Sequence, residues 1–150
     1  MKLAEAIQKA HHVYIIGNGG SYANAIHFCN DLLSVGIKAF TLDPSSLTAF
    51  ANDHGYETAF SCWINIVGEE GDLLIALSGS GNSQSIVEAI RMAKSKRMRS
   101  FAITGLFSQT NAAYRTADDF CCSGQNMQSA EEYQLVLAHQ CMRWLKDQIK

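Results

Sequence analysis

Two short stretches of the chain combine glycines with hydroxyl side chains where an apolar run ends. They are residues 17–21 (GNGGS) and residues 78–83 (SGSGNS). Glycines let the backbone approach a ligand closely, and the N–H groups at the start of a following helix have no partner within that helix. With the serine hydroxyls, such N–H groups can hold a phosphate without a positive side chain. The two stretches together predict an anion site, although each alone also fits an ordinary tight turn.

The residues within these two loops argue against a nucleotide as the ligand. The second loop lacks the lysine of the G-x-x-x-x-G-K-[ST] motif, and the first lacks the G-x-G-x-x-G spacing of dinucleotide sites. A nucleotide-binding α/β protein is therefore a weak alternative, and we expect no nucleotide cofactor. The favoured ligand is a small phosphorylated molecule with many hydroxyl groups.

Three titratable side chains could act on such a ligand. His27 and Asp31 stand four residues apart in a segment with helical periodicity, so they share one face of a helix and could move a proton together. A polar face in contact with water gives the same pattern. His139 interrupts the apolar run of residues 133–142, where a histidine serves either a site or a hydrogen bond within a core or interface.

The elements that must position these residues alternate along the chain. Apolar, strand-like runs occupy residues 12–17, 37–42, 72–78, 99–104 and 118–122, and segments with helical periodicity occupy residues 21–35, 57–67, 83–96 and about 129–149. Alternating strands and helices predict an α/β fold, namely a three-layer sandwich around a doubly wound, mainly parallel five-stranded sheet. Both glycine-serine loops then follow the carboxyl ends of strands, where such sheets bind ligands.

Composition narrows the class of protein. The 150 residues carry a net charge of −2 and are 47% hydrophobic, which predicts one globular domain over residues 1–150 and gives no reason to expect nucleic acid. No apolar run is long enough to span a membrane. The odd number of cysteines, five, and the absence of a signal peptide predict reduced thiols and a cytoplasmic location.

Four longer stretches follow one another in the chain: GNGGSYANAIHF, ANDHGYETAF, GEEGDLLIALSGSGNS and EEYQLVLAHQCMRWL. Together they resemble the SIS (sugar isomerase) domain, and most of all its phosphoheptose isomerase branch, from about Val13 to the C-terminus. That branch converts sedoheptulose 7-phosphate to an aldoheptose 7-phosphate through an enediol. The resemblance implies that the sugar phosphate is bound by Asn18, Gly19, Gly20, Ser21, Asn52, Asp53, Ser78, Gly79, Ser80 and Ser83.

The resemblance also implies catalytic and metal-binding positions. A His and a Glu on the catalytic helix of the family correspond here to His27 and Asp31, and a Gln and a His on its C-terminal helix correspond to Glu131 and His139. Several members hold zinc among these four side chains, so His27, Asp31, Glu131 and His139 are the candidate zinc ligands. Asp31 and His139 are the expected base and acid. The chain departs from the family in having Asp31 for a longer Glu and Glu131 for a neutral Gln.

Two functions of different class remain open at this point. One is an isomerase of sugar phosphates. The other is a non-catalytic sugar-phosphate-binding module that regulates a protein partner, a role that SIS domains also have. The resemblance further implies a homodimer or homotetramer, with Met142 and Trp144 of the last helix available for burial against a second copy.

Overall fold

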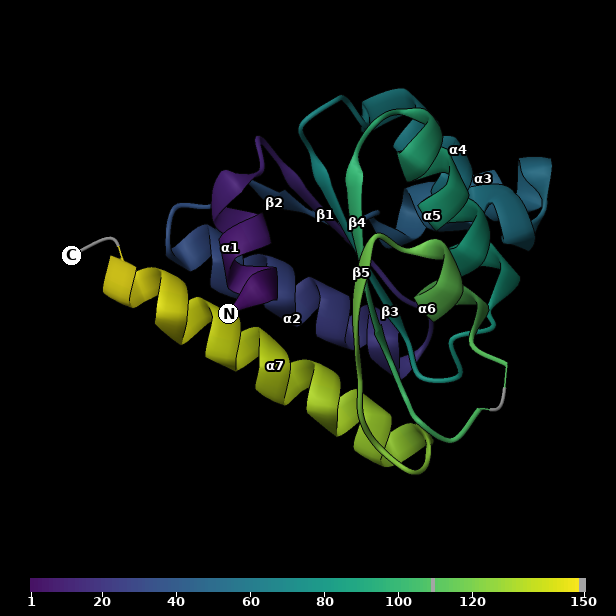
Figure 1. The fold of residues 1–150 in the computed structure, drawn as a ribbon. Helices are drawn as coiled ribbons and strands as arrows, with labels where there is room; N and C mark the ends of the chain where they lie inside the picture. Colours follow the sequence, from purple (N-terminus) through teal and green to yellow (C-terminus); the bar gives the residue numbers. More distant parts are fainter. Residues whose placement is uncertain (109, 149–150) are drawn as a thin grey trace.

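The computed structural model describes residues 1–108 and 110–148. Within them lies one sheet whose strands are β1 (Val13–Ile16), β2 (Ala39–Phe40), β3 (Leu73–Ser78), β4 (Arg99–Thr104) and β5 (Asp119–Cys122). The order is β2-β1-β3-β4-β5, and every neighbouring pair is parallel (Figure 1). The predicted α/β class and the parallel sheet of five strands are confirmed.

Helices cover both faces of this sheet (Figure 1). One face carries α1 (Lys2–Lys9), α2 (Gly20–Ser34) and α7 (Met127–Gln148), and the other carries α4 (Ala59–Val67), α5 (Gln84–Ser95) and α6 (Ala112–Thr116). The remaining helix, α3 (Pro44–His54), packs with the short 3-10 helix η1 (Tyr56–Thr58) against α4. Ile149, the expected end of the last helix, lies outside the described residues.

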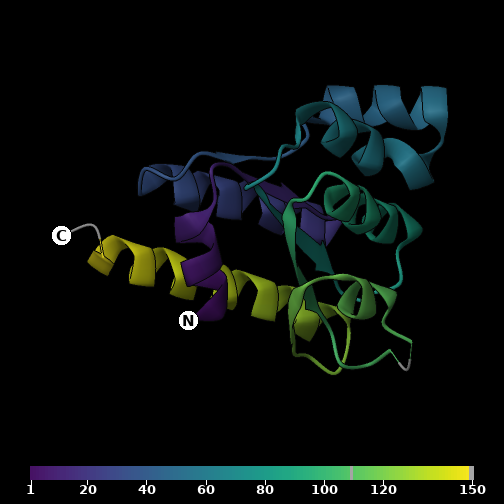
Figure 2. The same cartoon turned by 45° about the horizontal axis from the view of Figure 1, so that its top comes forward.

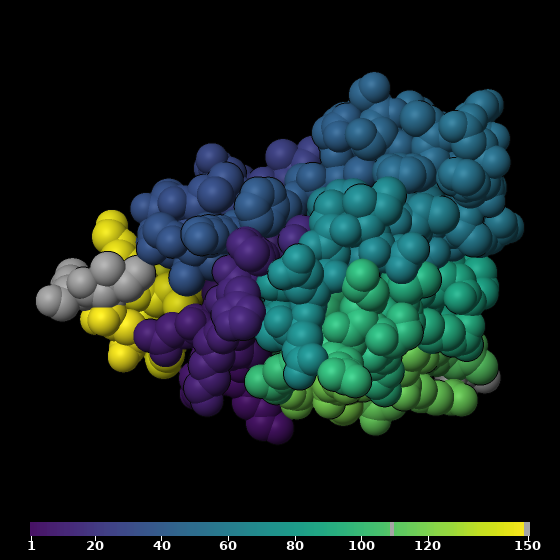
Figure 3. Space-filling model, turned by 90° about the horizontal axis from the view of Figure 1, so that it is seen from above, coloured from purple at the N-terminus to yellow at the C-terminus, as the bar shows by residue number. Residues whose placement is uncertain are grey.

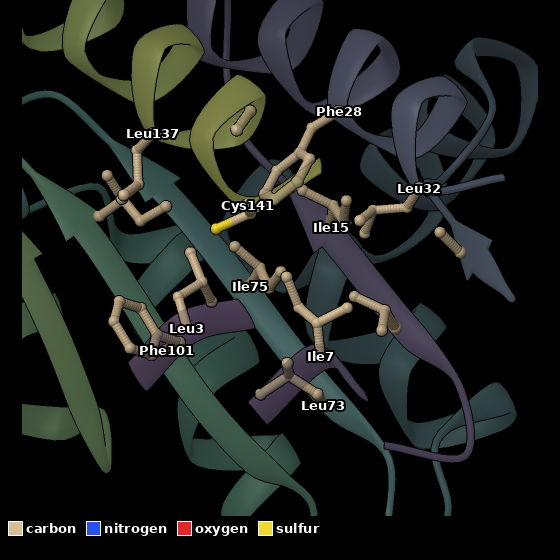
Figure 4. Close-up of a cluster of buried hydrophobic side chains, with 14 of the residues drawn as sticks. Leu3, Ile7, Ile15, Phe28, Leu32, Leu73, Ile75, Phe101, Leu137 and Cys141 are labelled. Atoms are coloured by element: carbon tan, nitrogen blue, oxygen red, sulfur yellow. The ribbon is translucent and has the colours of Figure 1, made fainter. Parts of the chain in front are cut away.

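The central strand β3 shows why the sheet has a core on each side. All six of its residues are buried. Leu73, Ile75 and Leu77 belong to the core beneath α1, α2 and α7, whereas Leu74 and Ala76 belong to the core beneath α4, α5 and α6. Figure 4 shows the first core, where side chains from the strands meet those of the covering helices. A continuous apolar run is what a strand covered on both faces requires.

Several elements differ from the sequence-based expectation. Helices α1, α3 and α6 were not predicted. Strand β2 has two residues instead of the expected six, because it pairs only with β1 at the sheet edge and Pro44 soon starts a helix. Trp144, expected to face a second copy, packs partly buried against the first core of its own chain.

Different helices occupy the two ends of the molecule. In Figures 2 and 3, α3 and α4 lie at one end, and the C-terminal part of α7 lies at the other. Among the described residues, no helix is both long enough and apolar enough to cross a lipid bilayer.

Candidate functional site

The glycine-serine loops meet at the carboxyl edge of the sheet. Strands β1 and β3 are neighbours, and the chain leaves β1 toward α2 on one face but leaves β3 toward α5 on the other. This reversal separates the two connections and opens a crevice between them. A pocket of about 280 Å³ lies there, lined by Asn18, Gly19, Gly20, Ser21, Leu77, Ser78, Gly79, Ser80, Ser83, Met127 and Glu131.

Two glycines of the first loop, Gly19 and Gly20, form the start of α2. Gly19 has a φ of +56°, a conformation that side chains other than glycine rarely adopt, and it is the N-cap residue of α2. Gly20 lies against Glu131, since an added Cβ would lie 2.4 Å from Oε2 of Glu131, and a larger residue here would displace that carboxylate. The loop thus brings the first turn of α2, with its unpaired N–H groups, to the wall of the pocket.

The three serines of the second loop differ in their hydrogen bonds. The hydroxyl of Ser78 accepts the N–H of Gly81 at 3.1 Å, and that of Ser80 accepts the N–H of Asn82 at 3.2 Å. Ser83 is the N-cap residue of α5, but its side chain makes no capping hydrogen bond. Hydroxyls that accept an N–H still have their own proton to donate, so all three can contact an anion.

The structure brings eight of the ten expected sugar-phosphate contacts to this pocket and leaves two outside. Asn52 and Asp53 lie exposed near the end of α3, where the Asn52 amide donates to the Asp53 carboxylate at 2.9 Å. The α3–η1 segment reaches the pocket through Tyr56 instead, whose hydroxyl donates to Oδ1 of Asn18. The binding roles of these residues stay predictions.

A buried polar seam ties α7 to the start of α2. Gln134 is only 1% exposed and donates from Nε2 to the hydroxyl of Ser21 at 3.0 Å. The Asn24 amide donates to Oε1 of Gln134 at 3.1 Å and to the backbone carbonyl of Glu131 at 2.9 Å. Because buried polar groups without partners are costly, this network fixes where α7 lies on α2.

Farther along the same two helices, three titratable side chains form a cluster. Nε2 of His27 and Nε2 of His139 are 2.9 Å apart, although 112 residues separate them in the sequence. Oδ2 of Asp31 lies 3.4 Å from Nε2 of His27 and 3.5 Å from Nε2 of His139. This oxygen is buried and has no hydrogen-bond partner in the described part of the chain.

These three side chains fit a zinc ion. Tetrahedral zinc has ligand bonds of about 2.0–2.2 Å, which places its donor atoms about 3.3–3.5 Å apart. The cluster offers two imidazole nitrogens and one orphaned carboxylate oxygen. The oxygen–nitrogen distances of 3.4 and 3.5 Å match that spacing, and the nitrogen–nitrogen distance of 2.9 Å is shorter than it. Glu131, the fourth expected ligand, does not belong to the cluster. Its eight-residue separation from His139 is about 12 Å along α7, so its carboxylate reaches Gly20 instead.

Sequence reasoning did not single out Gln134, Tyr56 or Met127, which also shape this site. Gln134 left a signal, since it is a polar residue within the apolar stretch of the last helix. Tyr56 and Met127 left none, because their contacts depend on how distant segments pack.

Comparison with known proteins places this geometry in a family. The model of the SIS domain matches residues 1–105. Phosphoheptose isomerase from Buchnera aphidicola subsp. Acyrthosiphon pisum (strain Tuc7) is 42% identical over 110 residues, which are 69% of this chain and 57% of that protein. This chain therefore spans less than two thirds of the length of that curated relative.

Two solved structures are similar over nearly the whole chain. The phosphoheptose isomerase GmhA from Neisseria gonorrhoeae has a TM-score of 0.85 at 28% identity, covering 97% of this chain and 81% of that one. A phosphoheptose isomerase from Francisella tularensis has a TM-score of 0.87 at 26% identity, covering 98% of this chain and 83% of that one.

Proposed function

Because the chain belongs to the SIS domain family, we propose that it is a sugar-phosphate isomerase that interconverts sedoheptulose 7-phosphate and an aldoheptose 7-phosphate. The observation that carries the proposal is the joint presence of two sites on one helix pair. A pocket of hydroxyl and N–H donors, with the Glu131 carboxylate in its lining, lies at the start of α2, and a cluster that could transfer protons lies farther along α2 and α7. The similarity to proteins named phosphoheptose isomerase supports the choice of a heptose.

The pocket would bind the phosphate. Helix N-termini bind phosphates because their N–H groups are unpaired and the helix dipole favours negative charge. Both α2 and α5 begin at this pocket, and Ser80 and Ser83 add hydroxyl donors. Asn18, Gly19, Gly20 and Ser21 would contribute from the first loop.

The cluster would carry the proton transfer. Asp31, as the base, would remove a proton from C1 of the ketose, giving an enediol, and return it to C2. The hydroxyl proton on O1 would pass to O2 by way of His139, which acts as acid and base. His27 lies seven residues beyond Gly20, about 10 Å along α2, so a phosphate in the pocket needs a chain of several carbons to bring its carbonyl near.

Zinc is the metal we propose for the cluster, held by His27, Asp31 and His139. When bound, it would supply Lewis-acid polarisation of the sugar carbonyl. The proposed proton transfer through Asp31 and His139 is that of the metal-free cluster, because a lone pair that binds zinc cannot accept a proton at the same time. Adding zinc ions should raise the melting temperature of the protein, because a ligand bound only by the folded state stabilises it. An unchanged melting temperature in His27→Ala and wild type alike would remove zinc from the proposal.

A second candidate function is a sugar-phosphate-binding module that regulates a protein partner. Its supporting observation is that the pocket lining shares no residue with the cluster of His27, Asp31 and His139. Asp31, with its short side chain, also reaches less far than the Glu expected from the resemblance. In this case the cluster would be structural and no isomerisation would occur.

We further propose one SIS domain over residues 1–150, self-association into a homodimer or homotetramer, and a cytoplasmic location. Strand β5 completes the sheet and α7 packs on α2, which supports one domain beyond the matched residues. All five cysteines are free, as in proteins of reducing compartments. Exposed apolar side chains beside the cluster, on α2 and α7, support self-association.

Exchange of solvent deuterium into C1 or C2 of sedoheptulose 7-phosphate distinguishes the two functions, because it reports enediol formation even when net conversion is slow. We expect exchange with the wild type and a loss of about a hundredfold to ten-thousandfold in His139→Ala, since general acid–base groups contribute about 10²–10⁴-fold. Binding of the sugar phosphate should change by less than about tenfold, because the phosphate pocket is intact.

The matched control is Gln140→Ala, which changes an exposed neighbour of His139 and should keep full exchange. If the wild type binds the sugar phosphate but exchanges no deuterium, the isomerase proposal fails and the binding module takes its place.

A further inference from the structure

The pocket proposed for the phosphate has an unexpected charge. Among its described lining residues, Glu131 is the only ionisable one, and the others are glycines, serines, Asn18, Leu77 and Met127. Neither lysine nor arginine is among them. A phosphate that binds here therefore meets a carboxylate and no positive side chain.

The carboxylate of Glu131 lies on the first turn of α2. A Cβ added to Gly20 would lie 2.4 Å from Oε2 and 2.5 Å from Oε1 of Glu131, so both oxygens rest close to the Gly20 backbone. A negative group is favoured at a helix N-terminus. Glu131 is thus an internal anion at the same helix end that a phosphate would use.

The fold holds Glu131 in this place. Asn24 on α2 donates to the backbone carbonyl of Glu131 at 2.9 Å, and the same amide donates to Gln134 one turn later on α7. Gln134 in turn donates to Ser21, beside the pocket. Because the Gln134–Ser21 bond is buried and the two Asn24 bonds are partly buried, the backbone of α7 cannot easily carry Glu131 away from α2.

We propose that Glu131 is a specificity-determining residue that sets the charge preference of the pocket. It lowers the affinity for phosphate dianions by like-charge repulsion and by occupying the helix end. For a ligand that also carries sugar hydroxyls, Glu131 offsets part of this loss of affinity, because its carboxylate accepts hydrogen bonds from the hydroxyls. The inference rests on the proposed function, namely that this pocket binds a sugar phosphate.

The test is calorimetric binding of inorganic phosphate, sedoheptulose 7-phosphate and unphosphorylated sedoheptulose. We expect Glu131→Gln and Glu131→Ala to bind inorganic phosphate about tenfold more tightly than the wild type, with a smaller gain at high salt. Neither variant should bind the unphosphorylated sugar more tightly. The matched control, Glu132→Gln, removes the charge of an exposed neighbour that does not line the pocket and should leave phosphate affinity unchanged.

The outcomes separate this inference from the proposed function. If the wild type binds sedoheptulose 7-phosphate and Glu131→Gln binds phosphate no more tightly, the inference is wrong and the proposed function stands. A gain in Glu131→Ala alone would also overturn it, because the cause would be space and not charge. If no variant binds any phosphate, the proposed function and the inference both fail. Circular dichroism of each variant establishes that it is folded.

Discussion

At the scale of single residues, the serines of the second loop belong to one motif but differ in the hydrogen bonds that their hydroxyls make. The Ser78 side chain is buried, and its hydroxyl accepts the N–H of Gly81 within the turn. Ser83 lines the same pocket as the N-cap residue of α5, yet its hydroxyl makes no capping hydrogen bond. N-cap serines usually stabilise their helix by such a bond. A serine at this position that does not cap is free to bind a ligand.

Replacing Ser83 with alanine should therefore separate binding from stability. We expect the affinity for sedoheptulose 7-phosphate to fall about tenfold, or about 1.4 kcal/mol, because a hydrogen bond to a charged group is lost. The free energy of unfolding should change by less than about 0.5 kcal/mol. Calorimetry and urea denaturation measure the two quantities. Ser95→Ala, at the exposed far end of α5, is the control, and equal affinities in all three proteins would contradict a binding role for Ser83.

The residues that sequence could identify are those whose signal is local. Gly19 and Ser83 stand in short loops whose composition alone predicts an anion site. The position of Glu131 against Gly20 is different, because it depends on how α7 packs on α2 and therefore on contacts between segments more than 100 residues apart. His27 and His139 were joined in advance only by the resemblance to a family, since no pattern in the chain predicts their 2.9 Å contact.

At the scale of elements, α3 is the least embedded helix. None of its residues is buried, and Leu47 and Phe50 pack only partly against the second core. Its start is defined by local chemistry instead, with Pro44 in the first turn and the Asp43 carboxylate accepting the N–H of Ser46 at 2.9 Å. Hydrogen bonds from Ser46 hold the pKa of Asp43 below its ordinary value of 3.8.

Asp43→Ala should therefore loosen α3 without unfolding the molecule. We expect amide hydrogen exchange in residues 45–48 to become about fivefold faster, while the melting temperature changes little, because α3 contributes no buried side chain to the cores. In the wild type, the lowered pKa means that the cap acts above the ordinary pKa of aspartate and is lost only as the pH falls below it. Once the pH dependence of the intrinsic amide exchange rate is taken into account, the protection of α3 should thus be constant from pH 5 to 8.

The control for this variant is Asp53→Ala, which removes a carboxylate from the other end of α3, where negative charge is not favoured. Equal exchange in both variants would show that the cap does not hold the helix. Mass spectrometry of residues 44–54 provides the measurement.

The helices missed by the sequence-based prediction were missed for two physical reasons, short length and a weak periodic signal. Helix α6 has five residues and α1 has eight, both too short to be stable alone, and α1 depends on burying Leu3 and Ile7 in the first core. Helix α3 has only a short apolar face, which includes Leu47 and Phe50, although Asp43 followed by Pro44 is a recognisable helix start. The long strands β3 and β4 and the helix α5 could be predicted because burial imposes a strong pattern on them.

At the scale of the whole molecule, α2 and α7 form the outer surface of one face of the sandwich. Ile26 and Leu33 on α2 are 45% and 54% exposed, and Val136 on α7 is 50% exposed. Ile26 and Leu33 are seven residues apart and so lie on one side of their helix. His27 on α2 and His139 on α7 are partly exposed, with side chains that are 47% and 37% accessible to solvent. An apolar surface beside partly exposed histidines is suited to a second copy of the chain.

We therefore expect a dimer or a larger homo-oligomer at micromolar concentration, with this surface inside the contact. Ile26→Lys combined with Val136→Lys should weaken association at least about a hundredfold, or about 2.7 kcal/mol, because the contact would have to bury unpaired charges. The control is Ile66→Lys, which changes a side chain of 68% exposure on α4, at the opposite face of the sheet, and should leave association intact. Light scattering coupled to size-exclusion chromatography measures the mass of each protein. A wild type that is monomeric at micromolar concentration would contradict the expectation, and dissociation by Ile66→Lys alone would move the contact to the face that carries α4.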